Sequence, residues 1–236
     1  MDKIKKALTE SGKYWIAFVG DSITSTEWVH PNWREMVEYV LKEEMNDEFP
    51  NFRTPNWGIR CFNFGYDGST SRDIVNKLDD ISGAKPNLMI LMIGANDPTQ
   101  GVSQDEYKNN LENILERMKK DNIEIWLSTC NKAWNDRSNE LCLPYVEIQR
   151  NLGLNNFIDL DKESDNFPKE KIYTFVSECD IVEENIKKGD LDFWHPNQLG
   201  NAYIAKVILK KIWNIDFDPE KYIETTNKGY KYPEYQ

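Results

Sequence analysis

The segment Trp15-Ile16-Ala17-Phe18-Val19, followed at once by Gly20-Asp21-Ser22, decides how the rest of the chain is interpreted. A run of apolar residues without alternation is typical of a strand that is covered on both faces. With Tyr14 added, this run is the first of five, which lie at 14–19, 59–64, 88–93, 123–128 and 157–160. The sequence therefore predicts a buried sheet of five short strands, with a serine where the first strand ends.

Three stretches repeat apolar residues at the spacing of a helix, namely Trp33–Met45, Glu106–Met118 and Leu199–Trp213. Strands that alternate with helices pair in parallel through right-handed crossovers, which puts helices on both faces of the sheet. The prediction is an α/β fold, a three-layer α/β/α sandwich, in one domain over residues 1–236.

Two segments fit this scheme poorly. Residues 162–189 mix charges with aromatic side chains, and a connection of that length usually has a function or structure of its own. We interpret this segment as an insertion near the active site, in which 181–188 has a helical pattern. Residues 216–236 carry several tyrosines and many charges, and we expect a C-terminal tail on the surface.

Composition narrows the classes of partner. The chain has 29 basic and 40 acidic residues, a net charge of −11, which argues against binding to nucleic acid. There is no apolar run long enough to span a membrane and no secretory signal at Met1. The four cysteines are scattered without a CxxC pair, as expected of a cytoplasmic protein. The sequence does not indicate an oligomeric state.

Polar blocks follow the predicted strands, at 20–24, 63–71 and 94–97, and a fourth block, 192–196, precedes the closing helix. Ligands of open parallel sheets bind outside the carboxyl ends of the strands, where these blocks would gather. The fourth block contains His195, three residues after Asp192. The only other histidine, His30, has Glu27 at that position, and we interpret it as a turn residue.

The four blocks resemble those of the SGNH hydrolases, also called the GDSL esterase/lipase family. The resemblance runs from Val19 to Pro196 and rests on Ser22, Gly68, Asn96 and the Asp192–His195 pair. It implies a flavodoxin-like parallel sheet and a serine esterase that needs no cofactor.

The same residues have a physical interpretation. Ser22 would be the nucleophile, His195 would take its proton and return it to the leaving alcohol, and Asp192 would orient the imidazole. The Ser22 N–H, the Gly68 N–H and the Asn96 amide are candidate donors to the negative oxygen of the tetrahedral intermediate. Pro196 suits the first turn of the closing helix. Asp21, Asp97 and Asn63 are more typical of caps and turns.

The substrate is harder to predict. Aromatic side chains in or near the loops expected at the site would stack on a sugar or line an acyl pocket, namely Trp28, Trp57, Tyr66, Trp134 and Trp194. Of these, Trp28, Tyr66 and Trp194 are the candidates for substrate binding. Apolar lid helices are absent, so we expect a short acyl group, acetyl on a carbohydrate in particular. A thioesterase, a lysophospholipase or an arylesterase of the same family remains open.

The sequence also allows a non-catalytic binding protein. Residues 20–26 look like the hydroxyl-rich phosphate loop of a flavodoxin-like phosphate or flavin binder. Such a protein would not need Asp192 or His195. No spacing of histidines indicates a metal site.

Overall fold

A five-stranded parallel sheet is the centre of the fold. The computed structural model describes residues 1–51, 53–181 and 186–227. The strands are β1 (Tyr14–Gly20), β2 (Ile59–Gly65), β3 (Leu88–Met92), β4 (Glu124–Ser128) and β5 (Phe157–Ile158), in the order β2-β1-β3-β4-β5. All neighbouring strands are parallel, which confirms the predicted sheet.

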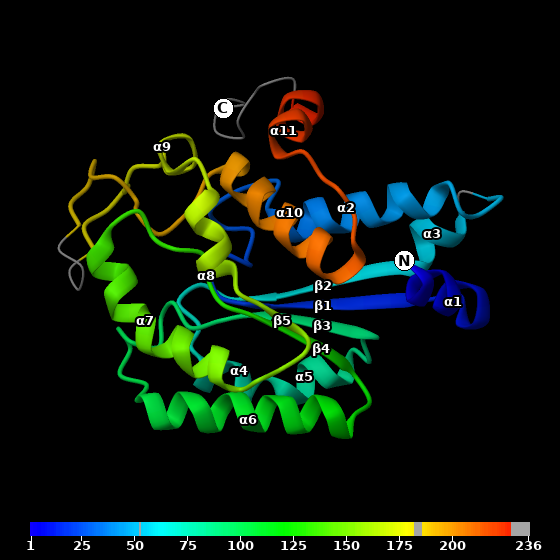
Figure 1. Cartoon of the computed structure of the whole chain (residues 1–236), viewed down its shortest axis with the longest axis horizontal. Coiled ribbons are helices and arrows are strands. Elements are labelled where there is room, and N and C mark those ends of the chain that lie inside the picture. The colour runs from blue at the N-terminus through cyan, green and yellow to red at the C-terminus, as the bar shows by residue number, and fades with distance from the viewer. Residues whose placement is uncertain (52, 182–185, 228–236) are drawn as a thin grey trace.

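The register of the sheet aligns its carboxyl ends. Gly20 of β1 pairs with Gly65 of β2 and with Met92 of β3, and the alignment continues through Ser128 of β4 to Ile158 of β5. Loops that leave these strands therefore start from one edge of the sheet. This edge lies toward the left in Figure 1.

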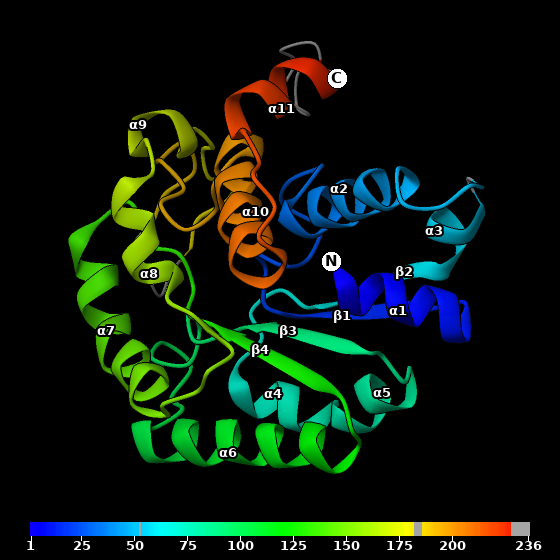
Figure 2. The same ribbon diagram turned by 45° about the vertical axis from the view of Figure 1, so that its right-hand side comes forward.

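Helices cover both faces of the sheet, which confirms the three layers (Figures 1 and 2). On one face lie α1 (Asp2–Ser11), α2 (Trp33–Asn46) and α10 (Gln198–Trp213), with α3 (Arg53–Gly58) beside them. On the other lie α4 (Ser71–Asn76), α5 (Leu78–Gly83), α6 (Gln104–Lys120) and α7 (Asp136–Asn151).

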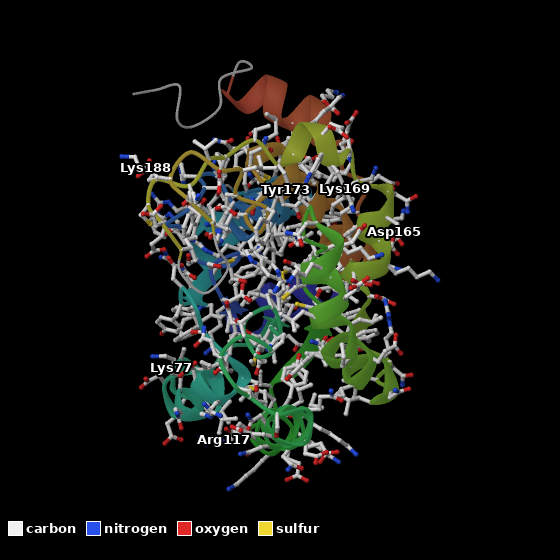
Figure 3. The ribbon with its side chains drawn as sticks, turned by 90° about the vertical axis from the view of Figure 1, so that its left-hand side faces the viewer. Lys77, Arg117, Asp165, Lys169, Tyr173 and Lys188 are labelled. Carbon is white, nitrogen blue, oxygen red and sulfur yellow. The ribbon has the colours of Figure 1, made fainter. Side chains whose placement is uncertain are left out.

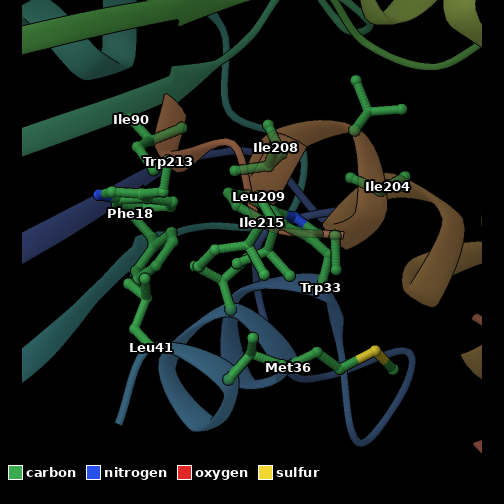
Figure 4. Packing of buried hydrophobic residues seen from close by; sticks show 14 of the residues in the cluster. Phe18, Trp33, Met36, Leu41, Ile90, Ile204, Ile208, Leu209, Trp213 and Ile215 are labelled. Atoms are coloured by element: carbon green, nitrogen blue, oxygen red, sulfur yellow. The ribbon is translucent and has the colours of Figure 1, made fainter. Parts of the chain in front are cut away.

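The core between the sheet, α2 and α10 is dense (Figure 4). Phe18 of β1 meets Trp33 of α2 edge to face, with ring centroids 5.1 Å apart, and both side chains are fully buried. The Asn201 side chain on α10 accepts the Trp33 N–H at 3.1 Å. Aromatic packing and a buried hydrogen bond thus fix the end of the chain against its beginning.

The predicted helices at Trp33–Met45, Glu106–Met118 and Leu199–Trp213 correspond to α2, α6 and α10, whereas α1, α3, α4, α5 and α7 have no predicted counterpart. In α7 the apolar repeat is weak because Pro144 interrupts it and few side chains are buried. The placement of Pro196 inside the closing helix is wrong. Asn197 caps α10 by accepting the Gly200 N–H at 3.2 Å, so the helix begins after it.

Segment 162–189 is a succession of short elements, α8 (Leu160–Glu163), η1 (Ser164–Asn166) and α9 (Lys169–Ile172). The Tyr173 hydroxyl accepts the Asn131 side-chain N–H at 2.9 Å and donates to the Lys132 carbonyl, which anchors the segment to the loop after β4. Figure 3, which faces the left-hand side of Figure 1, shows Tyr173 next to Lys169 and shows Lys188 at the outer edge of the segment. The Phe175 carbonyl accepts the Asp192 N–H at 3.0 Å, so the segment leads into the fourth polar block.

The helical interpretation of 181–188 is wrong at its described ends. Ile181 and Ile186 exchange two backbone hydrogen bonds, of 2.7 and 3.1 Å, as an antiparallel bridge, and 182–185 lies outside the described residues. That 162–189 is an insertion stays a prediction.

The end of the chain is not only a surface tail. Residues 219–227 form α11 (Pro219–Asn227), and Ile223 is buried against the core cluster that contains α10. The rest of the predicted tail, 228–236, lies outside the described residues. No helix in the described part of the chain combines the length and apolarity that a bilayer crossing requires.

Candidate active site

Ser22 stands two residues beyond the end of β1, where the backbone turns sharply. The Thr24 and Ser25 N–H groups both donate to the Asp21 carbonyl at 3.0 Å, which closes a single tight turn around the serine. A Cβ on Gly20 would lie 2.4 Å from both the Met92 carbonyl oxygen and the Thr24 hydroxyl. Glycine is therefore required there for the strand to run into the turn, and Ser22 is left partly exposed.

The structure brings Ser22, His195 and Asp192 together in one hydrogen-bonded chain. His195 Nε2 lies 2.9 Å from Ser22 Oγ, and His195 Nδ1 lies 2.7 Å from Asp192 Oδ2. The serine comes from the loop after β1, and the other two residues come from the loop before α10. The His195 side chain is 14% exposed, so the imidazole faces a site that solvent reaches.

Asp192 is held as a carboxylate. Burial acts to raise its pKa, but the His195 side chain and the backbone N–H groups of Trp194 and His195 outweigh burial, and the pKa is lowered. The two N–H groups donate to Oδ1 at 2.9 and 3.0 Å, which leaves Oδ2 for the imidazole. An ionised, doubly anchored carboxylate fixes the tautomer in which Nδ1 carries the proton and Nε2 faces Ser22.

The candidate donors to a negative oxygen come from three loops. Gly68 occupies the third position of a turn closed by the Ser69 N–H on the Tyr66 carbonyl, and its φ of +69° suits glycine. The Asn96 amide donates one N–H to the Ser69 carbonyl at 3.1 Å, so the side chain lies against this turn. Neither the Ser22 N–H nor the Gly68 N–H donates to another described residue.

Two buried carboxylates lie beneath these loops. Burial raises the pKa of Asp21 and that of Asp97 to about 6. Asp21 accepts the Ile23 N–H at 3.1 Å, as a turn residue does. Asp97 Oδ1 accepts both the N–H and the hydroxyl of Ser71, at 2.9 and 2.6 Å, and so ties the Asn96 loop to the start of α4. The other oxygen, Asp97 Oδ2, is buried without a hydrogen-bond partner among the described residues.

This burial makes stability depend on pH through Asp97. A carboxyl whose pKa rises from 3.8 to about 6 on folding binds its proton more tightly in the folded state. Its contribution to the free energy of unfolding is therefore lost as the pH rises from 4 through 6. We expect the free energy of unfolding of Asp97→Asn to rise by about 2 kcal/mol relative to that of wild type between pH 4 and pH 7.5, measured by urea unfolding. Parallel pH profiles of the two proteins would contradict this result.

The aromatic candidates occupy different places. Trp28 stacks on the His195 ring. Tyr66 is exposed at the same edge, with the Lys77 ammonium 4.1 Å from its ring centroid, so one face is already covered. Trp194 is half-buried next to Asp192, and its backbone N–H holds that carboxylate. Trp57 lies in α3, before β2 and away from the carboxyl ends, whereas Trp134 packs against Tyr173.

Sequence reasoning missed Asp67 and Ser25. The Ser25 hydroxyl donates to Asp67 Oδ1 at 2.6 Å, and the indole N–H of Trp28 donates to Asp67 Oδ2 at 3.0 Å. Asp67 thereby joins the loop of the serine to the loop of Gly68. Its position beside Gly68 was the only signal in the sequence.

The described residues offer no cluster of three histidine, cysteine or carboxylate side chains for a metal ion. They also lack the helix start that a phosphate loop needs after β1, because the next helix, α2, begins at Trp33 and is capped by Asn32.

Comparisons with known proteins bear on the family and on the fold. The model of the GDSL-like lipase/acylhydrolase family matches residues 18–203. Curated protein sequences give no significant match. Among solved structures, a lipase/acylhydrolase from Enterococcus faecalis is similar with a TM-score of 0.60 and 20% identity, over 84% of this chain and 95% of that one. Axe2, an acetylxylan esterase from Geobacillus stearothermophilus, is similar with a TM-score of 0.58 and 20% identity, over 87% and 95%.

At that identity the two structures show only that the fold is the same. The family assignment comes from the match to the family model. It spans most of the chain and includes the loops of Ser22, Gly68, Asn96 and His195. The chain therefore belongs to the GDSL-like lipase/acylhydrolase family and is a hydrolase that acts on ester bonds.

Proposed function

We propose that this protein hydrolyses short acyl esters, acetyl esters of a carbohydrate in particular, through an acyl-enzyme on Ser22. The observation that carries the proposal is the chain of contacts from Ser22 Oγ to His195 Nε2 at 2.9 Å and from His195 Nδ1 to Asp192 at 2.7 Å. A serine hydroxyl is a weak nucleophile until a neighbouring base accepts its proton, and His195 lies within reach of that proton.

In the first half-reaction Ser22 Oγ attacks the ester carbonyl while its proton passes to His195 Nε2. The carbonyl oxygen becomes negative, and the Ser22 N–H, the Gly68 N–H and the second N–H of the Asn96 amide would receive it. The intermediate then expels the alcohol, which takes the proton from His195. Ser22 is left acylated.

The second half-reaction repeats these steps with water as the nucleophile. Water gives a proton to His195 Nε2, its oxygen bonds to the acyl carbon, and Ser22 leaves with the proton returned. The products are the carboxylic acid and the free enzyme. Asp192 stays ionised throughout and stabilises the imidazolium that forms in each step.

Support for an acetyl group and a carbohydrate comes from two sources. Axe2, whose fold is similar, is an acetylxylan esterase. Tyr66 is exposed at the carboxyl edge of the sheet, where an aromatic ring can contact a sugar. The first observation favours an acetyl group, and the second favours a sugar as the alcohol.

A panel of acyl donors tests the proposal. We expect wild type to hydrolyse acetyl esters and acetylated xylo-oligosaccharides faster than butyryl and octanoyl esters, measured as kcat/KM by acid release. Ser22→Ala is the control for background hydrolysis. A preference for octanoyl esters would contradict the acetyl assignment, and a preference for acyl thioesters would favour a thioesterase.

A further inference from the structure

The indole of Trp28 covers one face of the His195 imidazole. The ring centroids are 3.9 Å apart and the planes are inclined by 4°, which is a parallel stack. Trp28 comes from the loop after β1, as Ser22 does, and it is 41% exposed. The histidine is thus bounded by Asp192 and Ser22 in its plane and by the indole above its plane.

The indole is itself held in place by hydrogen bonds. Its Nε1–H donates to Asp67 Oδ2 at 3.0 Å, and Asp67 Oδ1 accepts the Ser25 hydroxyl at 2.6 Å. Ser25 is buried, and its hydroxyl also lies 3.2 Å from the Ser22 carbonyl oxygen. A continuous set of contacts therefore runs from the backbone of the serine to the ring that covers the histidine.

The hydrogen bonds and the stacked indole restrain the imidazole in different directions. The hydrogen bonds at Nδ1 and Nε2 lie near the ring plane and resist its rotation away from Asp192 and Ser22. They resist tilting about the line between the two nitrogens far less. A parallel indole in van der Waals contact blocks that tilt on one side, because the ring cannot rotate without a clash.

The stack also has an electrostatic effect that appears only during reaction. When His195 takes the proton of Ser22 it becomes a cation, and a cation over a tryptophan face is attracted by the ring quadrupole. The neutral imidazole of the resting enzyme gains less from the same contact. An interaction that strengthens as the transition state forms raises kcat with little effect on KM.

We propose that Trp28 is a positioning residue of this site, which fixes the plane of His195 and stabilises its charged form, and that Asp67 acts through Trp28. This inference rests on the proposed function, because His195 must act as the base. It assigns to Trp28 a role toward the enzyme's own histidine.

The kinetic test uses acetyl ester hydrolysis by five variants. Trp28→Leu removes the aromatic face, and we expect kcat to fall about 5- to 30-fold with KM nearly unchanged. Trp28→Phe keeps a face and should recover most of that loss. Asp67→Ala releases the indole and should cost less than Trp28→Leu, and the double variant should be no worse than Trp28→Leu alone. Trp57→Leu, which removes a 62% exposed tryptophan remote from the site, is the matched control.

A spectroscopic test does not depend on catalysis. The chain has two histidines, so the ring protons of His195 are assigned by comparison with His195→Gln. Protons that lie over an indole face are shifted upfield in the NMR spectrum. We expect an upfield His195 resonance in wild type and Trp57→Leu that moves to an ordinary position in Trp28→Leu.

The outcomes separate the two proposals. Unchanged kcat in Trp28→Leu would overturn the positioning role and leave the esterase proposal intact. If KM rises while kcat stays constant, Trp28 is a substrate contact and not a positioning residue. A His195 resonance that does not move in Trp28→Leu would overturn the stack. Ester hydrolysis that survives in Ser22→Ala would remove the proposed function and this inference with it.

Discussion

Ser22→Ala should lower kcat for an acetyl ester by about four to six orders of magnitude. The substitution removes the only atom of Ser22 that reaches His195 Nε2, at 2.9 Å, and leaves the imidazole without a proton to accept. Residual turnover would come from water held near the same donors. The measurement is steady-state hydrolysis of an aryl acetate.

The pair Ser22 and His195 should behave as one unit. We expect His195→Ala to cost about as much as Ser22→Ala, and the double variant to be no slower than either, because each substitution disables the same step. His30→Ala is the matched control, since the His30 imidazole bonds to Glu35 at 2.9 Å rather than to the serine. Additive losses in the double variant would mean that the two residues act separately.

Asn96→Ala should lower kcat by about a hundred- to a thousandfold, the usual cost of one lost donor to a negative oxygen. The Asn96 amide uses one N–H on the Ser69 carbonyl at 3.1 Å, which aims the side chain and leaves the other N–H for substrate. Asn96→Asp should be at least as harmful, because it replaces that donor with a carboxylate that repels the developing charge. Both are measured with an acetyl ester, with KM followed separately.

The control for this substitution is Asn87→Ala. Asn87 accepts the Trp15 N–H at 2.8 Å, near the opposite edge of the sheet, so its loss should alter stability and not kcat. An Asn96→Ala enzyme with unchanged kcat and a raised KM would show that the amide binds the ground state and does not stabilise the transition state.

Much of the fold was predictable because it depends on local pattern. The continuous apolar run 15–19 indicates a strand buried on both faces, and the helical repeat of Leu199–Trp213 indicates a helix that covers one of them. Parallel pairing then follows from alternation, and parallel pairing brings the strand ends to one edge. That is why the sequence predicts Ser22 and Asn96 at the same edge, whereas the placement of His195 beside them follows from its interval to Asp192 and from the family resemblance.

Other features depend on contacts that no local pattern encodes. The stack of Trp28 on His195 joins residues far apart in the chain, and the indole N–H donates to Asp67 on a third loop. Helix α7 escaped prediction because Pro144 breaks its apolar repeat. The buried bond from Asp97 to Ser71 likewise depends on two loops that meet only in the folded sheet.

The measurement that tests the nucleophile most directly is covalent labelling by an organophosphonate, followed by peptide mapping. The label should be found on Ser22, at a rate that falls sharply in His195→Ala and is unchanged in His30→Ala. A wild-type enzyme that hydrolyses acetyl esters yet carries the label on another residue, or labels Ser22 equally fast without His195, would contradict the assignment.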